Sequence, residues 1–364
     1  MLLDARQWAA IVLVATILLV AAAACEDDTD DPFADEGIEI DWPSSNPDRY
    51  HWDGLSDPFF EVWNWHVFAP EFDESLTISM GVASPGSDDP ETRGAFTHAS
   101  GGGLAQPVID LYSMREFDAS RQLRDITVGG ARGTQTALRG AIGGDEPVEY
   151  DLTMTVDAAW DDTFGYLTNI PGLPTNWHVN AIAARATGTL RIGERAFDLD
   201  DAPMIEDHFW GTTFPGRSYR VIAGDFDEPD TSLVFFGGEI ALGPFDLPII
   251  LLAVRHGETV YEFRTQDLDV LGEISSDDAG HYTIRATKGD VRVEVRIINL
   301  IEDPAPGLAF GSSGVGFGGW TWHGARVDVN VLRLEEGPGW TTEFDASARH
   351  VLFGLGESDL YGDF

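Results

Sequence analysis

Lysine is almost absent from this sequence. Lys288 is the only one, and the chain carries 22 basic residues against 62 acidic ones, which gives a formal net charge of −40. Nucleic-acid binding needs clustered lysine and arginine, so this composition argues against a nucleic-acid partner. It also argues against docking on anionic lipid through charge. A surface this rich in carboxylates is solvated and self-repelling, which affects solubility and non-specific association.

Cysteine is equally scarce, because Cys25 is the only one. It follows an apolar run over 8–24 that is short for a membrane span and ends in small residues. Such a run is typical of a cleaved export signal, and a retained anchor is the alternative. Because Ala22-Ala23-Ala24-Cys25 resembles a lipobox, we predict that residues 1–25 are a lipoprotein signal peptide whose Cys25 is lipidated. The protein would then be exported and lipid-anchored on the periplasmic or cell-surface side of a membrane, with no disulfide in the mature chain.

Long helical patterns with caps are missing as well. From Trp42 onward, short apolar runs with period-two alternation are interrupted by Gly, Pro, Asp and Asn at intervals of about ten residues, as in sandwiches and barrels. The clearest runs are SLTISMGVA (75–83), YDLTMTVDAAW (150–160), SLVFFGGEIAL (232–242), DVRVEVRIINL (290–300) and ARVDVNVLRL (325–334). The predicted fold class is therefore all-β.

Two stretches are candidate domain boundaries, the turn-rich IPGLPTNW (170–177) and DDAPMIEDHFWG (200–211). We predict two β domains, an N-terminal one over 42–200 and a C-terminal one over 201–364. Residues 26–41 carry charge of one sign and few large apolar side chains, so they are predicted to be a disordered acidic linker between the signal and the fold.

Motifs for metal binding and for a serine nucleophile are also absent. No G-x-S-x-G stretch occurs, and most histidines are scattered without metal-ligand spacing: His66, His178, His256, His281 and His323. We therefore predict neither a metal nor a cofactor.

Aromatic side chains, in contrast, are concentrated in YHWDGLSDPFFEVWNWHVFAP (50–70). If 59–68 is a strand, Glu61, Trp63 and Trp65 point to one face because side chains alternate. A carboxyl among tryptophans loses the hydration of its charged form, which raises its pKa and keeps it protonated. Such a group can donate a proton or bind a ligand. The alternative is a buried structural carboxylate paired with an arginine.

This stretch resembles the N-terminal signature of the tocopherol cyclase family, H-W/F-D-G followed by F-F-E-G-W-Y-F. The family's central block is similar to residues 164–211, which end in DHFWG, and RSYRVIAGDFDEPDTSLVFFGGEI (217–240) and AVRHGETVYEF (253–263) follow in the family's order. TTEFDASARHVLFGLGE (341–357) resembles the C-terminal block, so the resemblance extends over most of 46–357. It implies two lipocalin-like β domains, as in the related hydroxyneurosporene-synthase and lipocalin-like proteins.

The resemblance also implies a set of site residues. Asp207 and His208 are the expected proton donors and Glu61 the polar anchor for a ligand hydroxyl, in a pocket at or near the domain junction. The alternative for Asp207 and His208 is a structural turn. Their spacing alone is a weak signal, because neighbours on a strand face opposite ways. Ligand-binding residues are expected to be His51, Trp52, Trp63, Trp65, Trp210 and Tyr261. The chain departs from the family pattern at Val62, Asn64, Trp65 and Phe209, and the loss of a tyrosine and an asparagine implies a drier pocket.

Two functions share such a pocket. The first is cofactor-free, acid-initiated cyclisation or hydration of a prenylated quinol or other isoprenoid, in which aromatic faces shield a cation. The second is a non-catalytic, lipid-anchored carrier of an isoprenoid, quinone or other hydrophobic small molecule. A purely structural surface lipoprotein would explain the acidity but not the aromatic signature.

Overall fold

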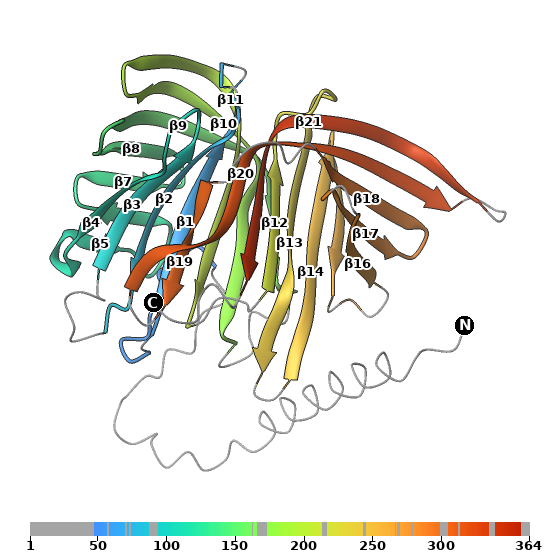
Figure 1. The fold of residues 1–364 in the computed structure, drawn as a ribbon, viewed down its shortest axis with the longest axis horizontal. Helices are drawn as coiled ribbons and strands as arrows, with labels where there is room; N and C mark the ends of the chain where they lie inside the picture. The colour runs from blue at the N-terminus through green and yellow to red at the C-terminus, as the bar shows by residue number, and fades with distance from the viewer. Residues whose placement is uncertain are drawn as a thin grey trace, which may run out of the picture. The chain divides into compact units, whose positions relative to one another are not determined.

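A computed structural model describes residues 47–357, apart from short gaps at 57, 70, 73, 87–93, 162, 166–172, 213–216, 243–244, 266, 268–269, 278–279, 299–304, 312–313 and 335–338. The predicted signal peptide with Cys25 and the predicted acidic linker lie outside the described residues. Strands form nearly all of the regular structure (Figure 1). Among the described residues, no helix is long and apolar enough to cross a membrane.

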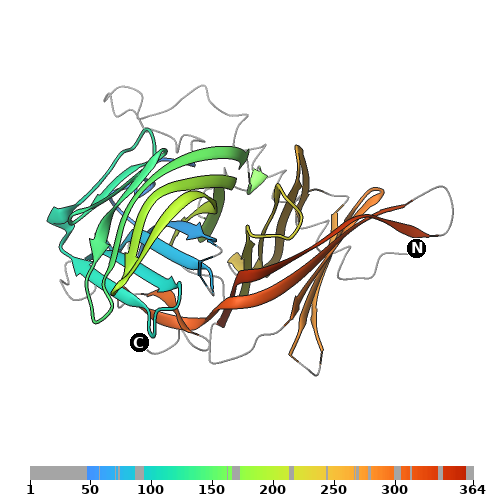
Figure 2. The same cartoon turned by 90° about the horizontal axis from the view of Figure 1, so that it is seen from above.

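The first sheet has eleven strands, all paired antiparallel, in the order β4-β3-β2-β1-β11-β10-β9-β8-β7-β6-β5. Their bounds are β1 Phe60–Val67, β2 Leu76–Ala83, β3 Gly94–Gly101, β4 Val108–Tyr112, β5 Phe117–Ala119, β6 Asp125–Val128, β7 Ala131–Thr134, β8 Ala137–Ile142, β9 Val148–Trp160, β10 Thr175–Ile192 and β11 Arg195–Gly211. The edge strands β4 and β5 are consecutive in sequence and are joined through the short 3-10 helix η1, Met114–Glu116. This connection brings the two edges together, so the sheet curls into a nearly closed barrel (Figure 2).

The second sheet repeats this plan with ten strands. Its order is β15-β14-β13-β12-β21-β20-β18-β17-β16, with β19 paired to β20. The bounds are β12 Arg217–Ala223, β13 Thr231–Leu242, β14 Phe245–His256, β15 Thr259–Arg264, β16 Val270–Ser276, β17 Tyr282–Lys288, β18 Val291–Ile298, β19 Ala305–Gly311, β20 Gly314–Leu334 and β21 Trp340–Glu357. In each sheet the first strand pairs with the last, β1 with β11 and β12 with β21. The predicted all-β class with two barrel-like sheets is confirmed.

Burial follows the sequence pattern of each strand. β9 alternates buried and exposed residues along most of its length, because one face lines the first core and the other faces solvent. β1 is buried on both faces. One face contributes Trp63 and Trp65 to the core inside the first sheet, while the other contributes Phe60 and Val62 to a second core. That second core is shared with the second sheet, as the contact of Trp177 with Phe236 at 5.4 Å between ring centroids illustrates.

The predicted joint at 200–211 lies inside a strand. β11 runs without interruption from Arg195 to Gly211, and the change of sheet falls between Gly211 and Arg217. The aspartates and the proline of this stretch resemble a joint, but they lie at an irregularity within the strand. There Asp201 has φ of 60°, and the pairing with β10 shifts register between Ala186 and Gly188. The prediction of two separate domains divided at 200 and 201 stays a prediction.

Candidate functional site

The candidate site is built on the pairing of β1 with β11. In their antiparallel register, Glu61 lies opposite Trp210, Trp63 opposite His208, and Trp65 opposite Glu206. Side chains directly opposite each other in a strand pair share a face, so these residues all point into the core of the first sheet. The structure thus places the carboxyl of Glu61 on the face of Trp63 and Trp65, as the alternation predicts.

Glu61 makes a compact cluster with two histidines. Its Oε1 lies 2.9 Å from Nε2 of His208 and 2.9 Å from Nδ1 of His51. The backbone N–H of His51 donates to Oε2 at 2.9 Å. Glu61 and His208 are fully buried, and the His51 side chain is nearly so, with 9% exposed. His208, which lies 147 residues after Glu61 in the chain, therefore shares one desolvated site with Glu61 and His51.

The second nitrogen of His208 assigns the protons in this cluster. Nδ1 lies 2.8 Å from the carbonyl oxygen of Pro47, which can only accept, so Nδ1 carries the hydrogen. In the neutral ring, Nε2 then presents its lone pair to Oε1, and the hydrogen between them belongs to Glu61. Burial raises the pKa of Glu61 well above its ordinary value, against the opposing hydrogen bond from the His51 backbone. Burial and the neighbouring His51 lower the pKa of His208 well below its ordinary value. These directions favour a neutral acid bonded to a neutral imidazole.

Tryptophan rings enclose this cluster. Trp63 stacks on His208, with centroids 4.5 Å apart and planes at 17°, and Trp210 stacks on His51 at 3.9 Å and 5°. Trp52 packs against the same core, and its indole N–H donates to the carbonyl oxygen of Ser56 at 3.0 Å. These contacts keep the imidazole rings in place and present aromatic faces to anything bound beside Glu61.

A short turn positions His51 ahead of the strand. Asp53 Oδ1 accepts from the backbone N–H groups of Leu55 and Ser56 at 2.8 and 2.7 Å, and Gly54 adopts φ of 84°. Asp53 and Gly54 therefore form the turn, as Asx side chains and glycine commonly do in such loops.

The same three side chains are close enough for a metal ion to reach. The ligand atoms of His51, Glu61 and His208 all lie within 4.8 Å of one another, although their sequence spacing resembles no metal motif. Because Oε1 is already within hydrogen-bond distance of both imidazole nitrogens, we assign the cluster to hydrogen bonding.

Asp207 lies on the opposite face of β11 from His208, so the structure separates the expected donor pair. It accepts from Asn64 Nδ2 at 2.8 Å and from the Trp177 indole at 2.9 Å, and it is ion-paired with Arg220 of β12. Although burial acts to raise it, the Arg220 guanidinium and the His66 hydrogen bond hold the pKa of Asp207 below its ordinary range. An ionised aspartate at the junction of the two sheets is an anchor, and it has no proton to donate at neutral pH.

Tyr261 is not brought to the Glu61 cluster. It belongs to β15, packs against the core of the second sheet, and its hydroxyl donates to Glu343 Oε1 at 3.0 Å. The other expected ligand-binding residues, His51, Trp52, Trp63, Trp65 and Trp210, all lie in or against the core of the first sheet. The stretch AVRHGETVYEF, which follows the family's order, forms the end of β14, a turn and most of β15 in the second sheet.

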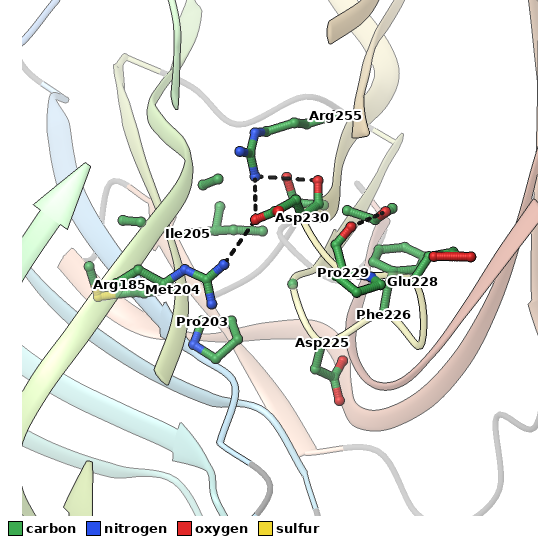
Figure 3. A pocket seen from close by; sticks show the side chains of 15 residues that line it. Arg185, Pro203, Met204, Ile205, Asp225, Phe226, Glu228, Pro229, Asp230 and Arg255 are labelled. Atoms are coloured by element: carbon green, nitrogen blue, oxygen red, sulfur yellow. Dashed lines mark hydrogen bonds and ion pairs between the residues drawn. The ribbon is translucent and has the colours of Figure 1, made fainter. Parts of the chain in front are cut away.

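A cleft at the junction of the sheets contains none of the expected site residues. It has a volume of about 350 Å³ and is lined by residues of β10, β11, β13 and β14 and of the turn between β12 and β13 (Figure 3). Three of its charged groups contact each other, since Arg185 Nη2 lies 3.3 Å from Asp230 Oδ1 and Arg255 Nη1 lies 3.3 Å from the Asp230 carbonyl oxygen. This cleft is therefore separate from the Glu61 cluster.

Sequence reasoning missed Glu206 and Arg124. Glu206 is 1% exposed and lies two residues before His208 on the inward face of β11, where its Oε2 is 2.5 Å from Arg124 Nη1. The alternation of IEDHFWG could have identified Glu206, because positions 206, 208 and 210 share a face. No local signal marks Arg124, which lies in the turn before β6.

Comparison with known proteins gives a family and a fold. The model of the tocopherol cyclase-like family matches residues 112–309, more than half of the chain, and leaves β1 outside the match. The structure of CghA with Sch210972 is similar over 86% of this chain and 95% of its own, with a TM-score of 0.51 and 12% identity. Kievitone hydratase from Nectria haematococca is similar over 86% of this chain and 95% of its own, with a TM-score of 0.47 and 10% identity. No curated protein matches the sequence significantly.

Proposed function

This chain belongs to the tocopherol cyclase-like family, and from that membership and the Glu61 cluster we propose that it cyclises or hydrates an isoprenoid substrate by cofactor-free proton transfer. The substrate class that fits is a prenylated quinol, which has both an alkene to protonate and an oxygen to capture the resulting cation. The observation that carries the proposal is the Glu61 carboxyl, buried between two histidines and enclosed by tryptophan rings.

The reaction requires few steps. The Glu61 carboxyl gives its proton to one alkene carbon, which leaves a tertiary cation on the other. The faces of Trp63 and Trp210 stabilise that positive charge. The Glu61 carboxylate left behind keeps the hydrogen bond from the His51 backbone, which favours the charged form. A phenol oxygen of the substrate, or water, then bonds to the cation and loses its proton, which yields a chroman or an alcohol.

Two buried donors support the binding of an oxygen-containing ligand in this core. The Tyr50 hydroxyl and the Trp63 indole N–H are both buried and have no hydrogen-bond partner within the described residues. Their rings are 6.5 Å apart, and burial raises the pKa of Tyr50, so its hydroxyl keeps its proton. Buried donors in native proteins are almost always paired, and a substrate oxygen would satisfy both.

The test is turnover of geranylhydroquinone by the purified protein in deuterated water. We expect a chroman that carries one solvent deuterium on carbon, and we expect Glu61→Gln to lower turnover by about a hundredfold or more, the scale of general-acid catalysis. Glu294→Gln serves as the matched control and should keep activity, because Glu294 is a glutamate of the second sheet that pairs with Arg285. The assay is repeated after exhaustive chelation, and lost turnover that returns with added metal would favour coordination by the cluster.

A carrier is the alternative that the same experiment separates. If geranylhydroquinone quenches tryptophan fluorescence but neither a chroman nor an alcohol ever forms, the protein binds such ligands without catalysis. If no isoprenoid binds, the enzyme and carrier proposals fail together.

A further inference from the structure

We propose that Glu206 is the catalytic base of this reaction, which accepts the proton that the attacking oxygen loses. The inference rests on the proposed function and assigns the group that takes part in its second proton transfer. Acid-initiated cyclisation has two proton transfers, one to carbon and one from oxygen. We assign the first to Glu61 and the second to Glu206.

The strand geometry places Glu206 on the required face. Glu206, His208 and Trp210 are alternate residues of β11 and point into the same core as Glu61 and Trp63. Glu61 pairs with Trp210 and Glu206 with Trp65, so the two glutamates are four residues apart along the strand pair, about 13 Å, and the Glu61 carboxyl reaches toward His208. A prenylated ring that lies along this face can therefore reach a carboxyl at each end, with the Trp63 and His208 rings between them.

The charges around Glu206 suit a base. Arg124 Nη1 lies 2.5 Å from Oε2, and Asp48 Oδ1 lies 4.0 Å from the same arginine nitrogen. This ion pair is nearly sealed from solvent, because the side chains of Arg124 and Glu206 are 5% and 1% exposed. Burial raises the pKa of Glu206 to about 7, with Arg124 opposing and Asp48 adding to the rise. A base near neutrality is ionised often enough to act and strong enough to take the proton.

The step conserves atoms and charge. As the bond between the phenol oxygen and the tertiary carbon forms, the O–H bond breaks and its proton passes to the Glu206 carboxylate. The C–H bond formed at the start used the proton of Glu61, so each turnover leaves Glu61 ionised and Glu206 protonated. Transfer of one proton back to Glu61 after product release restores the enzyme, with no oxidant, reductant or co-reactant.

The experiment compares Glu206→Gln with wild type on a series of geranylphenols whose ring substituents make the hydroxyl increasingly acidic. We expect turnover of the parent geranylhydroquinone to fall by about a hundredfold or more. The deficit should shrink as the phenol becomes more acidic, because a better leaving proton needs less help from a base. A purely structural role for the Arg124 pair predicts the same deficit for every phenol. Glu294→Gln is again the control, with thermal unfolding recorded for each variant.

A second readout is the pH dependence of kcat/KM. Wild type should show a limb that rises with pH near about 7, and Glu206→Gln should lose that limb. A folded Glu206→Gln variant with wild-type turnover, or with a deficit independent of phenol acidity, overturns the assignment of Glu206. If Glu61→Gln is inactive in the same assays, the proposed function then still stands. Absence of turnover by wild type overturns both.

Discussion

Asp207→Asn should cost this protein stability far more than it costs chemistry. The substitution removes the negative charge that pairs with Arg220 and is bonded by Asn64 and Trp177 between the two sheets. Breaking one partner of a buried ion pair costs about 3–5 kcal/mol. Because the Arg220 side chain is 20% exposed and can recover some hydration, we expect about 3 kcal/mol.

That loss can be measured as a shift in Tm. With an unfolding entropy of about 2 cal/mol/K per residue, a fold of this size should lose about 5 °C. Since the folded pKa of Asp207 is depressed, its contribution is present above the unfolded value of about 4 and is lost as pH falls through the folded value, so the variant should approach wild type in acid.

Thermal and urea unfolding of wild type, Asp207→Asn, Arg220→Met and the double variant would check the magnitude. The double variant should recover part of the loss, because no charge remains buried without a partner. If Asp207→Asn unfolds like wild type yet loses about a hundredfold in turnover, the proton-donor role expected from the family is right and the anchoring role is refuted.

The remaining predictions concern three other positions. Because the folded pKa of Glu61 is raised, its stabilising contribution is complete below the unfolded pKa of about 4.3 and declines as pH rises. Glu61→Gln should therefore flatten the fall of the unfolding free energy with pH. An unchanged profile would mean that Glu61 is not held protonated. Gly133→Ala would place a methyl 2.5 Å from the Trp65 ring and should cost about 1–3 kcal/mol with a shift in tryptophan emission, whereas Gly130→Ala has open space and should change neither. Cys25→Ser should release the protein from the membrane fraction of its host, and unchanged fractionation with the signal segment retained would contradict lipidation.

Local alternation predicted the parts of the site that lie on strands. The period-two pattern of β1 correctly placed Glu61, Trp63 and Trp65 on one face, and the same rule, applied to β11, separates Asp207 from His208. Sequence could not show that Pro47 fixes the protons of His208, because that contact joins a loop to a distant strand. For the same reason it could not show the partnership of Arg124 with Glu206.

Polar residues inside long strands were also difficult to assign from the sequence. DDAPMIEDHFWG contains the charges and the proline of a joint, yet its inward positions are buried against β1 and β10. A positive φ at Asp201 absorbs the irregularity without ending the strand. Tertiary pairing therefore overrode local turn chemistry, a conflict that is typical of segments that combine structural and functional demands.

The central claim is that Glu61 is protonated beside a neutral His208 at neutral pH, and infrared difference spectroscopy tests it most directly. The spectrum of wild type minus Glu61→Gln isolates the carbonyl stretch of this one carboxyl, while Glu206 contributes equally to both and cancels. We expect a band of a protonated carboxylic acid that persists to alkaline pH and disappears in the variant, because burial holds the Glu61 pKa well above its ordinary value. A difference spectrum that shows only carboxylate bands at neutral pH would contradict the account, since an ionised Glu61 has no proton to give to an alkene.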